Sequence, residues 1–328
     1  MKNLPVTVLI PSYNMGTSLV VLIKSIISSG LINIIEELII VDDGSTDDTK
    51  HIVKQFSSHL NIRYHDLGEN VGRFRARVEG AKTAKTTSLL FLDARTECGK
   101  DIYLGIQEFW NYSVVQGTVR IPVDEGLFNL YWERSHRFIF QANFKDQKEG
   151  FWLTSENFDH YICGTTIFYT KKEIFLYACE KFLEDPLNDD RALIQEIVKI
   201  EKIWVTEKLE VIWRPRQEIR SFLYRLWERG PSFVSYHVYG PGSPLKWFVY
   251  LGLITVVANL FTLMSAPVFW TKLACLQLFI LAATIILFTR SPKEIIKLSG
   301  LHIMVILFFG MGILKGLLVE FSKRKVSS

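Results

Sequence analysis

Three long apolar segments occupy the C-terminal part of the chain and limit what it can fold into. They are Leu245–Met264, Val268–Phe288 and Leu298–Val319. Each is close to the ~20 residues that an α-helix needs to cross a bilayer core. Three such segments in succession are unusual in a soluble domain. The sequence therefore predicts a helical membrane domain over residues 245–328, whose first two helices are joined by a tight hairpin at Ser265–Pro267.

The basic residues around these segments leave the topology of the third segment open. Arg290, Lys293 and Lys297 would lie on the side of the preceding domain, as the positive-inside rule prefers. Lys323–Lys325 would lie on the far side if all three segments cross, which the rule disfavours. Either the third segment does not cross fully, or the rule is overridden.

The N-terminal part of the chain alternates between short apolar runs and helical patterns. The strand-like runs are Val6–Ile10, which Pro11 ends, Glu37–Val41, Ile62–His65 and Ser88–Leu92. The helical patterns between them are Ser18–Ile27, Asp47–Phe56 and Arg73–Thr83. This alternation predicts an α/β domain over residues 1–213, with a mostly parallel sheet and helices on both faces.

Composition excludes several classes of protein. The net charge is +4 and no charge run is long enough for a nucleic-acid tail, so we expect no nucleic-acid partner. The four cysteines are scattered without a C-x-x-C pair, which argues against a zinc site or a disulfide framework and fits a reducing compartment.

Carboxylates directly follow two of the predicted strands. Asp42 and Asp43 come after the second apolar run, and Asp93 comes after the run that ends at Leu92. Ligands of parallel sheets bind outside the carboxyl ends of the strands. Two adjacent carboxylates repel each other, so we expect donors of a nucleotide base or ribose to satisfy Asp42 or Asp43. Asp93 is suited to hold a divalent ion against a diphosphate.

Two further segments have a structural and a functional interpretation. Asn70–Arg77 places arginines at the start of a helix, which suits a diphosphate but equally a solvated basic helix end. Asn188 or Asp189 could simply cap the helix that begins near Ala192. Where a donor-sugar site exists, Asp190 is the natural general base.

Residues 214–244 form a predicted arginine-rich interfacial helix and linker. Five arginines are interleaved with apolar residues at helical spacing, and the helix is expected to end where a break begins at Pro231. Such a helix suits a membrane interface, and its arginines suit anionic head groups or a lipid-linked diphosphate. The arginines are Arg214, Arg216, Arg220, Arg225 and Arg229. The aromatic block from Phe128 to Trp152 is expected to shape the acceptor pocket or to form an aromatic core.

These motifs together resemble the family 2 glycosyltransferases with the GT-A fold, a Rossmann-like architecture. The resemblance covers about residues 4–230 and rests on "VTVLIPSYN", "VDDGSTDDT", "ENVGRFRAR", "CGTTIFYTKKEIF" and "FLEDPLNDDRAL" in that order. It implies an inverting transfer from a nucleotide sugar, UDP-linked by family frequency. The implied donor-binding residues are Pro11, Tyr13, Asp42, Asp43, Asn70, Gly72, Arg77 and Arg95. Asp190 with Asp189 would be catalytic, and Gly164, Arg216 and Arg220 would lie on the acceptor side.

The chain departs from the family pattern at the metal motif. The family usually has D-x-D, whereas this chain reads Asp93-Ala94-Arg95. Asp93 could hold Mg²⁺ or Mn²⁺ together with the diphosphate. Alternatively, Arg95 could replace part of the ion's charge.

The membrane segments indicate what kind of acceptor to expect. We expect a multi-pass protein of the cell membrane, with a cytoplasmic catalytic domain, that glycosylates a lipid or lipid-linked saccharide in cell-envelope polysaccharide biosynthesis. Direct transfer to polyprenyl phosphate is an alternative. A non-catalytic nucleotide-binding membrane partner is another, because of the altered D-x-D motif.

Overall fold

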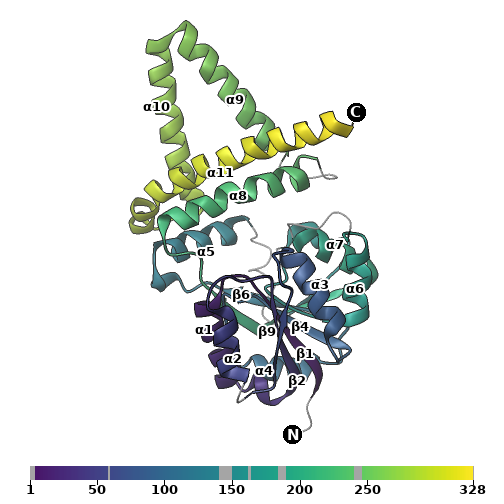
Figure 1. Ribbon diagram of the computed structural model, residues 1–328. Coiled ribbons are helices and arrows are strands. Elements are labelled where there is room, and N and C mark those ends of the chain that lie inside the picture. The colour runs from purple at the N-terminus through teal and green to yellow at the C-terminus, as the bar shows by residue number, and fades with distance from the viewer. Residues whose placement is uncertain are drawn as a thin grey trace. The chain divides into compact units, whose positions relative to one another are not determined.

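The computed structural model describes residues 4–57, 60–139, 150–161, 164–183, 190–239 and 246–327 (Figure 1). The chain forms two compact units. The first comprises residues 1–122 and 139–214, and the second comprises residues 123–138 and 215–328. Segment 123–138, which the sequence groups with the catalytic domain, therefore packs with the C-terminal helices.

A single sheet organises the first unit. In the described residues its strand order is β3-β2-β1-β4-β8-β6-β9-β5, and β7 also pairs with β9. Strands β1 to β4 are parallel, while β8 runs antiparallel to both of its neighbours. The strands are Leu4–Ser12 (β1), Ile35–Asp42 (β2), Ile62–Asp66 (β3), Ser88–Leu92 (β4), Thr96–Cys98 (β5), Val114–Arg120 (β6), Phe151–Leu153 (β7), Ile167–Lys171 (β8) and Ile203–Trp213 (β9).

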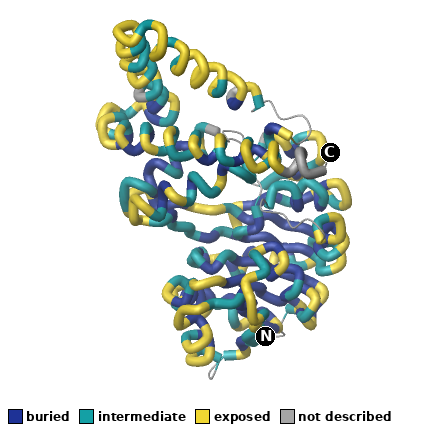
Figure 2. The backbone as a smooth tube through the Cα atoms, turned by 45° about the horizontal axis from the view of Figure 1, so that its top comes forward, coloured by how far each residue is buried: buried dark blue, intermediate teal, exposed yellow. Residues whose placement is uncertain are grey.

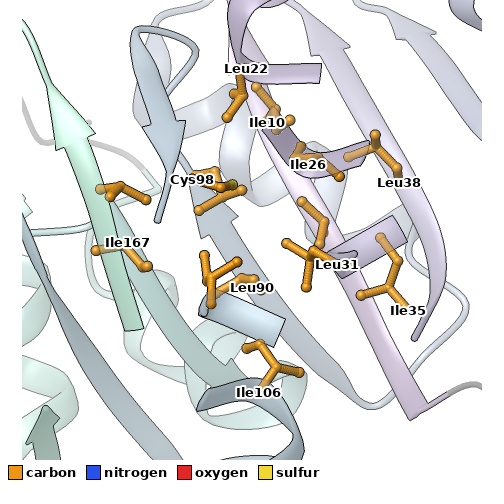
Figure 3. Close-up of a cluster of buried hydrophobic side chains, with 14 of the residues drawn as sticks. Ile10, Leu22, Ile26, Leu31, Ile35, Leu38, Leu90, Cys98, Ile106 and Ile167 are labelled. Atoms are coloured by element: carbon orange, nitrogen blue, oxygen red, sulfur yellow. The ribbon is translucent and has the colours of Figure 1, made fainter. Parts of the chain in front are cut away.

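Helices cover both faces of this sheet, as the sequence predicts. Helices α1 (Gly16–Ser28), α2 (Thr49–Ser57) and α4 (Ile102–Phe109) pack on one face, and α3 (Arg73–Thr83), α6 (Lys172–Glu180) and α7 (Asp190–Ile200) on the other (Figure 1). Along β1, Val8 and Ile10 point into the first core and Leu9 into the second, the alternation expected of a strand. Figure 3 shows Ile10 meeting Leu22 and Ile26 of α1 in the first core.

The first strand is longer than the sequence indicates. Pro11 does not end it, because β1 continues through Pro11, opposite Val41, to Ser12, opposite Asp42. The pairing of β1 with β4 stops at Leu9, so at Pro11 the strand is paired with β2 alone. A proline, which lacks an N–H donor, is tolerated at such a position.

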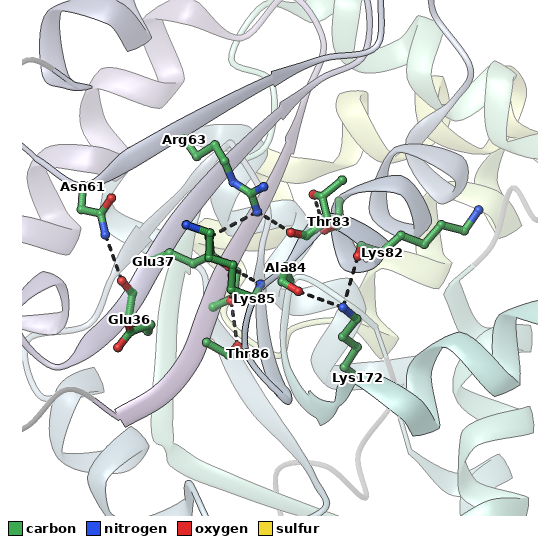
Figure 4. Close-up of polar contacts among 12 residues, drawn as sticks. Glu36, Glu37, Asn61, Arg63, Lys82, Thr83, Ala84, Lys85, Thr86 and Lys172 are labelled. Atoms are coloured by element: carbon green, nitrogen blue, oxygen red, sulfur yellow. Dashed lines mark hydrogen bonds and ion pairs between the residues drawn. The ribbon is translucent and has the colours of Figure 1, made fainter.

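The amino ends of the parallel strands are held by a polar cluster around Glu37 (Figure 4). The Oε1 of Glu37, which is buried, accepts hydrogen bonds from the Thr7 hydroxyl at 2.8 Å and the Lys85 N–H at 2.7 Å. Its Oε2 lies 3.2 Å from the Arg63 guanidinium. A buried charge needs such partners, and they tie β1, β2 and β3 together at the edge opposite Asp42.

The second unit is helical. Its helices are α5 (Leu127–Ile139), α8 (Ile219–His237), α9 (Lys246–Ser265), α10 (Pro267–Ala283) and α11 (Pro292–Ser327). Short 3₁₀ turns complete the chain at Leu31–Asn33, Val123–Glu125, Phe158–His160 and Thr284–Leu287. Residues of α5, α8 and α11 share one core, in which the rings of Phe128 and Trp132 of the aromatic block contact the ring of Phe222. Phe140 and Phe144 lie outside the described residues.

Two helices of this unit are long and apolar enough to cross a membrane, Pro267–Leu287 and Pro292–Ser322. The shorter apolar stretch Val249–Ser265 lies in α9, which forms a hairpin with α10 (Figure 1). Most of α9 and α10 is exposed (Figure 2).

The arginine-rich helix differs from its predicted extent at both ends. It begins at Ile219, so Arg214 and Arg216 precede it, and it continues through Pro231 to His237 instead of breaking there. Proline cannot donate to the carbonyl four residues earlier, that of Trp227. A Cβ placed on Gly312 of α11 would lie only 2.5 Å from that carbonyl oxygen, so α11 packs directly against this turn of α8.

Candidate active site

The turn that follows β2 contacts the loop that follows β3 and leads into α3. Gly44 has a φ of +72°, and a Cβ there would lie 2.6 Å from the Glu69 carbonyl carbon. A side chain is therefore excluded by both conformation and space. The carboxylate of Asp43 accepts hydrogen bonds from the N–H groups of Val71, at 2.7 Å, and Gly72, at 3.1 Å. The loop that leads into α3 is thus held at the carboxyl end of β2.

Asp42 is also satisfied within the chain. Its carboxylate accepts hydrogen bonds from the Tyr64 hydroxyl and from the Ser45 N–H, the latter at 2.9 Å. Burial raises the pKa of the Tyr64 phenol, and the Asp42 carboxylate raises it further. The pKa of Asp43 is raised by burial, against the lowering effect of its two N–H donors. Both carboxylates keep lone pairs for a ligand, because a carboxylate accepts about four hydrogen bonds.

The connection after β1 is fastened to the same turn. Asn14 has a positive φ of 52°, and its Oδ1 accepts the Thr46 N–H at 2.7 Å. Its own N–H donates to the Ser45 hydroxyl at 2.9 Å. The preceding Tyr13 is exposed and Pro11 is buried. Tyr13, Asn14 and the turn at Asp42–Thr46 therefore form one continuous rim at the carboxyl ends of β1 and β2.

Asp93 lies at the end of β4 between two guanidinium groups. Its Oδ1 accepts the Arg95 N–H at 3.1 Å, and the Arg95 Nε lies 3.9 Å from the same oxygen. Its Oδ2 lies 3.9 Å from a guanidinium nitrogen of Arg73. The Arg95 guanidinium also lies 5.8 Å from the ring centroid of Trp213 on β9. The position that is acidic in D-x-D thus places a cation beside Asp93.

Asp190 joins the first turn of α7 to α3. Its Oδ1 accepts hydrogen bonds from Arg77 at 2.9 Å and Arg73 at 3.2 Å, and its Oδ2 accepts one from the Thr165 hydroxyl at 2.6 Å. Burial alone would raise the pKa of Asp190, but the two arginines and the threonine hold it well below the usual range of a carboxyl group. Asp190 is therefore ionised throughout the physiological pH range.

Arg77 is a buried cation with unused donors. Its side chain is 2% exposed, and among the described residues its Nε and Nη2 have no hydrogen-bond partner. Burial lowers the pKa of Arg77, against the raising effect of Asp190. A buried guanidinium with N–H groups that lack a partner is costly, and a carboxylate or phosphate oxygen is the kind of acceptor that satisfies it.

The remaining predicted residues fall into three groups. Gly164 is held by Gln116 of β6, whose amide nitrogen donates to the Gly164 carbonyl at 3.0 Å, next to Thr165. Asn70 is exposed and Gly72 precedes α3 with a φ of +88°. Arg216 and Arg220 belong to the second unit, and Asp189 lies outside the described residues.

Sequence reasoning missed three residues of this cluster. Arg73 contacts both Asp93 and Asp190, Thr165 contacts Asp190, and Tyr64 contacts Asp42. The basic helix start contained Arg73, but spacing could not rank it above Arg75. Thr165 follows the glycine turn that was recognised, and Tyr64 lies within a predicted strand, where an aromatic residue carries no functional signal.

The residues at Asp93 suit a hard divalent cation that takes most of its ligands from a substrate. In the described part of the chain, no group of three or more His, Cys, Asp or Glu is placed to hold a metal ion. Asp93 supplies one carboxylate that is 14% exposed. Mg²⁺ commonly uses one or two carboxylates together with phosphate oxygens and water. One carboxylate fits this pattern when a diphosphate is present.

The parallel strands with carboxylates at their carboxyl ends are those of an α/β domain whose ligand site lies at this edge. The sequence model described as Glycosyl transferase family 2 matches residues 7–171, about half of the chain. The chain belongs to glycosyl transferase family 2, as its motifs indicated.

One curated relative matches a short segment of the chain. The chain is 36% identical over 66 residues to the poly-β-1,6-N-acetyl-D-glucosamine synthase of Staphylococcus epidermidis. The aligned segment covers 20% of this chain and 16% of that protein.

Solved structures share the fold over nearly the whole chain. The mannosyltransferase PcManGT from Pyrobaculum calidifontis, in complex with GDP-Man and Mn²⁺, superposes with a TM-score of 0.61 at 17% identity, over 97% of this chain and 88% of its own. S. aureus TarS 1–349, in complex with UDP-GlcNAc, gives a TM-score of 0.50 at 16% identity, over 99% and 92%. The predicted GT-A fold with a helical C-terminal region is confirmed.

Proposed function

We propose that this protein is a membrane-bound inverting glycosyltransferase that moves a sugar from a nucleotide donor to a lipid or lipid-linked saccharide. The observation that carries the proposal is the convergence of Asp43, Asp93, Arg77 and Asp190 at the carboxyl edge of one sheet. These side chains come from four separate segments of the chain. Together they offer acceptors for a nucleoside, cations for a diphosphate and a carboxylate for an acceptor hydroxyl.

The nucleoside would contact the rim formed by Tyr13 and the Asp42–Thr46 turn. Carboxylates there accept hydrogen bonds from a base or ribose. The diphosphate would lie at the N-terminus of α3, where the partly exposed Arg73 would contact it and the buried Arg77 would act through its ion pair with Asp190. Both features favour a nucleoside diphosphate as the leaving group, and its base remains to be identified by experiment.

Asp190 would accept the proton of the acceptor hydroxyl as that hydroxyl attacks the anomeric carbon. A single carboxylate suffices for direct displacement with inversion. The strongly lowered pKa of Asp190 makes it a weak base in the free protein. Donor binding would draw the Arg73 and Arg77 guanidinium groups toward the diphosphate, which would restore basicity to Asp190.

Asp93 would hold a divalent cation against the diphosphate. When bound, Mg²⁺ or Mn²⁺ would offset the charge of the leaving group. Arg95, which lies beside Asp93, would add to this charge. If chelation of all divalent cations leaves transfer intact, Arg95 and Arg73 supply the counter-charge without an ion.

The apolar helices of the second unit support a membrane-embedded acceptor. Pro267–Leu287 and Pro292–Ser322 are each long and apolar enough to cross a bilayer. With so few spans a wide export channel is not expected, so we propose transfer of single sugars, in a protein of the cell membrane whose catalytic unit faces the cytoplasm. The arginines at 216 and 220 would contact acceptor head groups.

The test is release of nucleoside diphosphate by the full-length protein in native-lipid membranes. A panel of nucleotide sugars is supplied with Mg²⁺ or Mn²⁺, alongside Asp190→Asn. Asp101→Asn, an exposed aspartate at the start of α4, is the matched control. We expect release from one donor, a fall of about 10²-fold or more in Asp190→Asn, and no change in Asp101→Asn.

The mass of the product separates the acceptor classes. A lipid monophosphate sugar would identify polyprenyl phosphate as the acceptor, and an elongated lipid-linked glycan would identify a saccharide. Absence of release from every donor, with acceptor lipids present, would contradict the proposal and favour a nucleotide-binding protein without catalysis.

A further inference from the structure

One side of α11 is packed against two charged helices along most of its length. Near its start, the Glu294 carboxylate makes two hydrogen bonds of 2.9 Å with the Arg134 guanidinium of α5. Two turns later, His302 lies 2.9 Å from the Tyr131 hydroxyl. Toward its end, the Lys315 ammonium lies 3.7 Å from the ring centroid of Trp227 on α8.

The backbones of α8 and α11 also touch. A Cβ on Gly230 would lie 1.9 Å from the Gly312 carbonyl carbon, and one on Gly316 would lie 2.8 Å from the Pro231 Cα. Contacts this close occur only where two helices are packed without side chains between them. Figure 1 shows α8 and α11 side by side along their length. The two helices must therefore share one orientation relative to a membrane.

The other side of α11 carries a stripe of apolar residues that are exposed in the described part of the chain. Its members recur at intervals of three, four or eight residues and so share one face of the helix. They are Ile296, Met304, Leu307, Met311, Leu314 and Leu318, each between 36% and 81% exposed. Apolar area of this extent on one face marks a contact with protein or membrane. The exposed apolar residues of α9 and α10 in the same unit favour lipid.

The partners of α11 cannot enter hydrocarbon at low cost. Helix α8 carries Arg220, Arg225 and Arg229, and α5 carries Glu133 and Arg137 beside Arg134. If α11 crossed the bilayer end to end, α8 would be carried into the core with it. Each charged residue at the centre of a bilayer costs at least ~2.5 kcal/mol by the lowest scale. An orientation along the surface leaves these charges at the head groups.

The hairpin of α9 and α10 has the opposite character. From Trp247 to Ser265, α9 has no charged residue, and its 20 residues span about 30 Å, the thickness of the hydrocarbon core. In α10 the one charged residue is Lys272, which lies one turn from the hairpin tip and can reach the far head groups. The hairpin can therefore cross the bilayer twice.

We infer that α11 does not cross the membrane but lies along its surface, with the Ile296–Leu318 stripe in the acyl region of the leaflet on the catalytic side. The α9–α10 hairpin alone crosses. Both chain ends then lie on one side of the membrane, which removes the conflict with the positive-inside rule that a crossing third segment would create. This inference rests on the proposed membrane association, and it specifies the lipid surface of the protein.

The first test measures topology in sealed inverted membrane vesicles. Epitope tags are placed, in separate full-length proteins, before Met1, after Ser328, or between Ser265 and Ala266. Protease added outside should remove both terminal tags equally and leave the hairpin tag intact until detergent opens the vesicles. A C-terminal tag that is protected together with the hairpin tag would overturn the inference.

The second test measures depth, and it separates the two proposals. In a background with both Cys163→Ser and Cys275→Ser, spin labels are placed at Ile296, Met304, Met311 and Leu318 in phosphatidylglycerol-rich vesicles. A helix along the surface gives the same shallow depth at all four sites. A crossing helix would spread them over about 33 Å. Labels at Leu251 and Val257 of α9 should differ in depth, because this helix crosses the bilayer. If these two labels meet no lipid, the proposed membrane association is wrong. That outcome does not depend on the result of the donor-release assay.

Discussion

The Arg77 guanidinium lies 2.9 Å from the Asp190 carboxylate, a contact that joins the middle of α3 to the first turn of α7. Arg77 is almost completely buried and Asp190 is its charged partner. The pair therefore contributes to stability as well as to the site. The activity of Asp190 variants must therefore be measured on protein that has been shown to be folded.

Removal of the Asp190 charge should destabilise the first unit at neutral pH. Asp190→Asn leaves the Arg77 cation buried with a neutral partner, at an expected cost of about 3 kcal/mol. Because the pKa of Asp190 is lowered in the folded protein, its stabilising effect is complete above the ordinary aspartate pKa of ~3.9 and is lost as the pH falls below it. Thermal unfolding in detergent should show a variant that melts lower at pH 7, with a smaller difference near pH 3. An equal difference at both pH values would contradict the ion pair.

The Thr165 hydroxyl should position the proposed base. Thr165→Val removes the 2.6 Å hydrogen bond to Asp190, and loss of a bond to a charged group predicts a fall in kcat of about ten- to a hundredfold. It also removes one influence that lowers the pKa of Asp190, so the acid limb of the kcat/KM profile should move to higher pH. Thr165→Ser keeps the hydroxyl and should retain both the rate and the profile. If Val and Ser behave alike, the hydroxyl has no such role.

A substitution at Gly44 should disturb donor binding. Gly44→Ala places a Cβ 2.6 Å from the Glu69 backbone at a positive φ, so the loop that holds Val71 and Gly72 on Asp43 must move. We expect a loss of more than ~1 kcal/mol in stability and a raised KM for the donor. Gly68→Ala is the control, because its φ of +78° is similar but no atom lies within 4 Å of the added Cβ. Equal effects of the two variants would show that close packing at Gly44 is unimportant.

The contact of α8 with α11 should depend on Gly312. Gly312→Leu brings a side chain against the Trp227 carbonyl, whereas Gly310→Leu points into open space. In the first variant we expect the helices to separate and the protein in detergent to become sensitive to protease near α8. The second variant should behave like the wild type. Limited proteolysis followed by mass spectrometry makes the comparison, and protection of both variants would refute the close contact.

Much of the parallel half of the fold was predictable from local pattern. Strand Ser88–Leu92 and helix Arg73–Thr83 have the predicted bounds, because apolar period and flanking residues agree there. The predicted end of β1 at Pro11 was wrong. A proline is tolerated there because the pairing of β1 with β4 has already stopped at Leu9, which local sequence does not reveal. The predicted break of α8 at Pro231 was also wrong. The turn of α8 around Pro231 packs against Gly312, which is more than 80 residues away in the sequence.

The candidate site was predictable in its ingredients but not in its contacts. Strand ends identify Asp42, Asp43 and Asp93 as candidates, because ligands of parallel sheets bind at the carboxyl ends of the strands. The pairing of Asp190 with Arg77 and Arg73 could not be predicted, since it joins segments more than 100 residues apart.

The membership of α5 in the second unit bears on how the chain is made. Its buried residues Leu130 and Tyr131 pack with Phe222 and Leu226 of α8 and Leu301 of α11. As the ribosome delivers the chain, α5 emerges some 80 residues before its first partner and more than 150 before its last. The catalytic half would thus wait with an apolar helix uncovered until the C-terminal helices arrive. A fragment that ends at Arg214 would leave this surface exposed, so we expect the solubility of the protein to depend on residues 215–328.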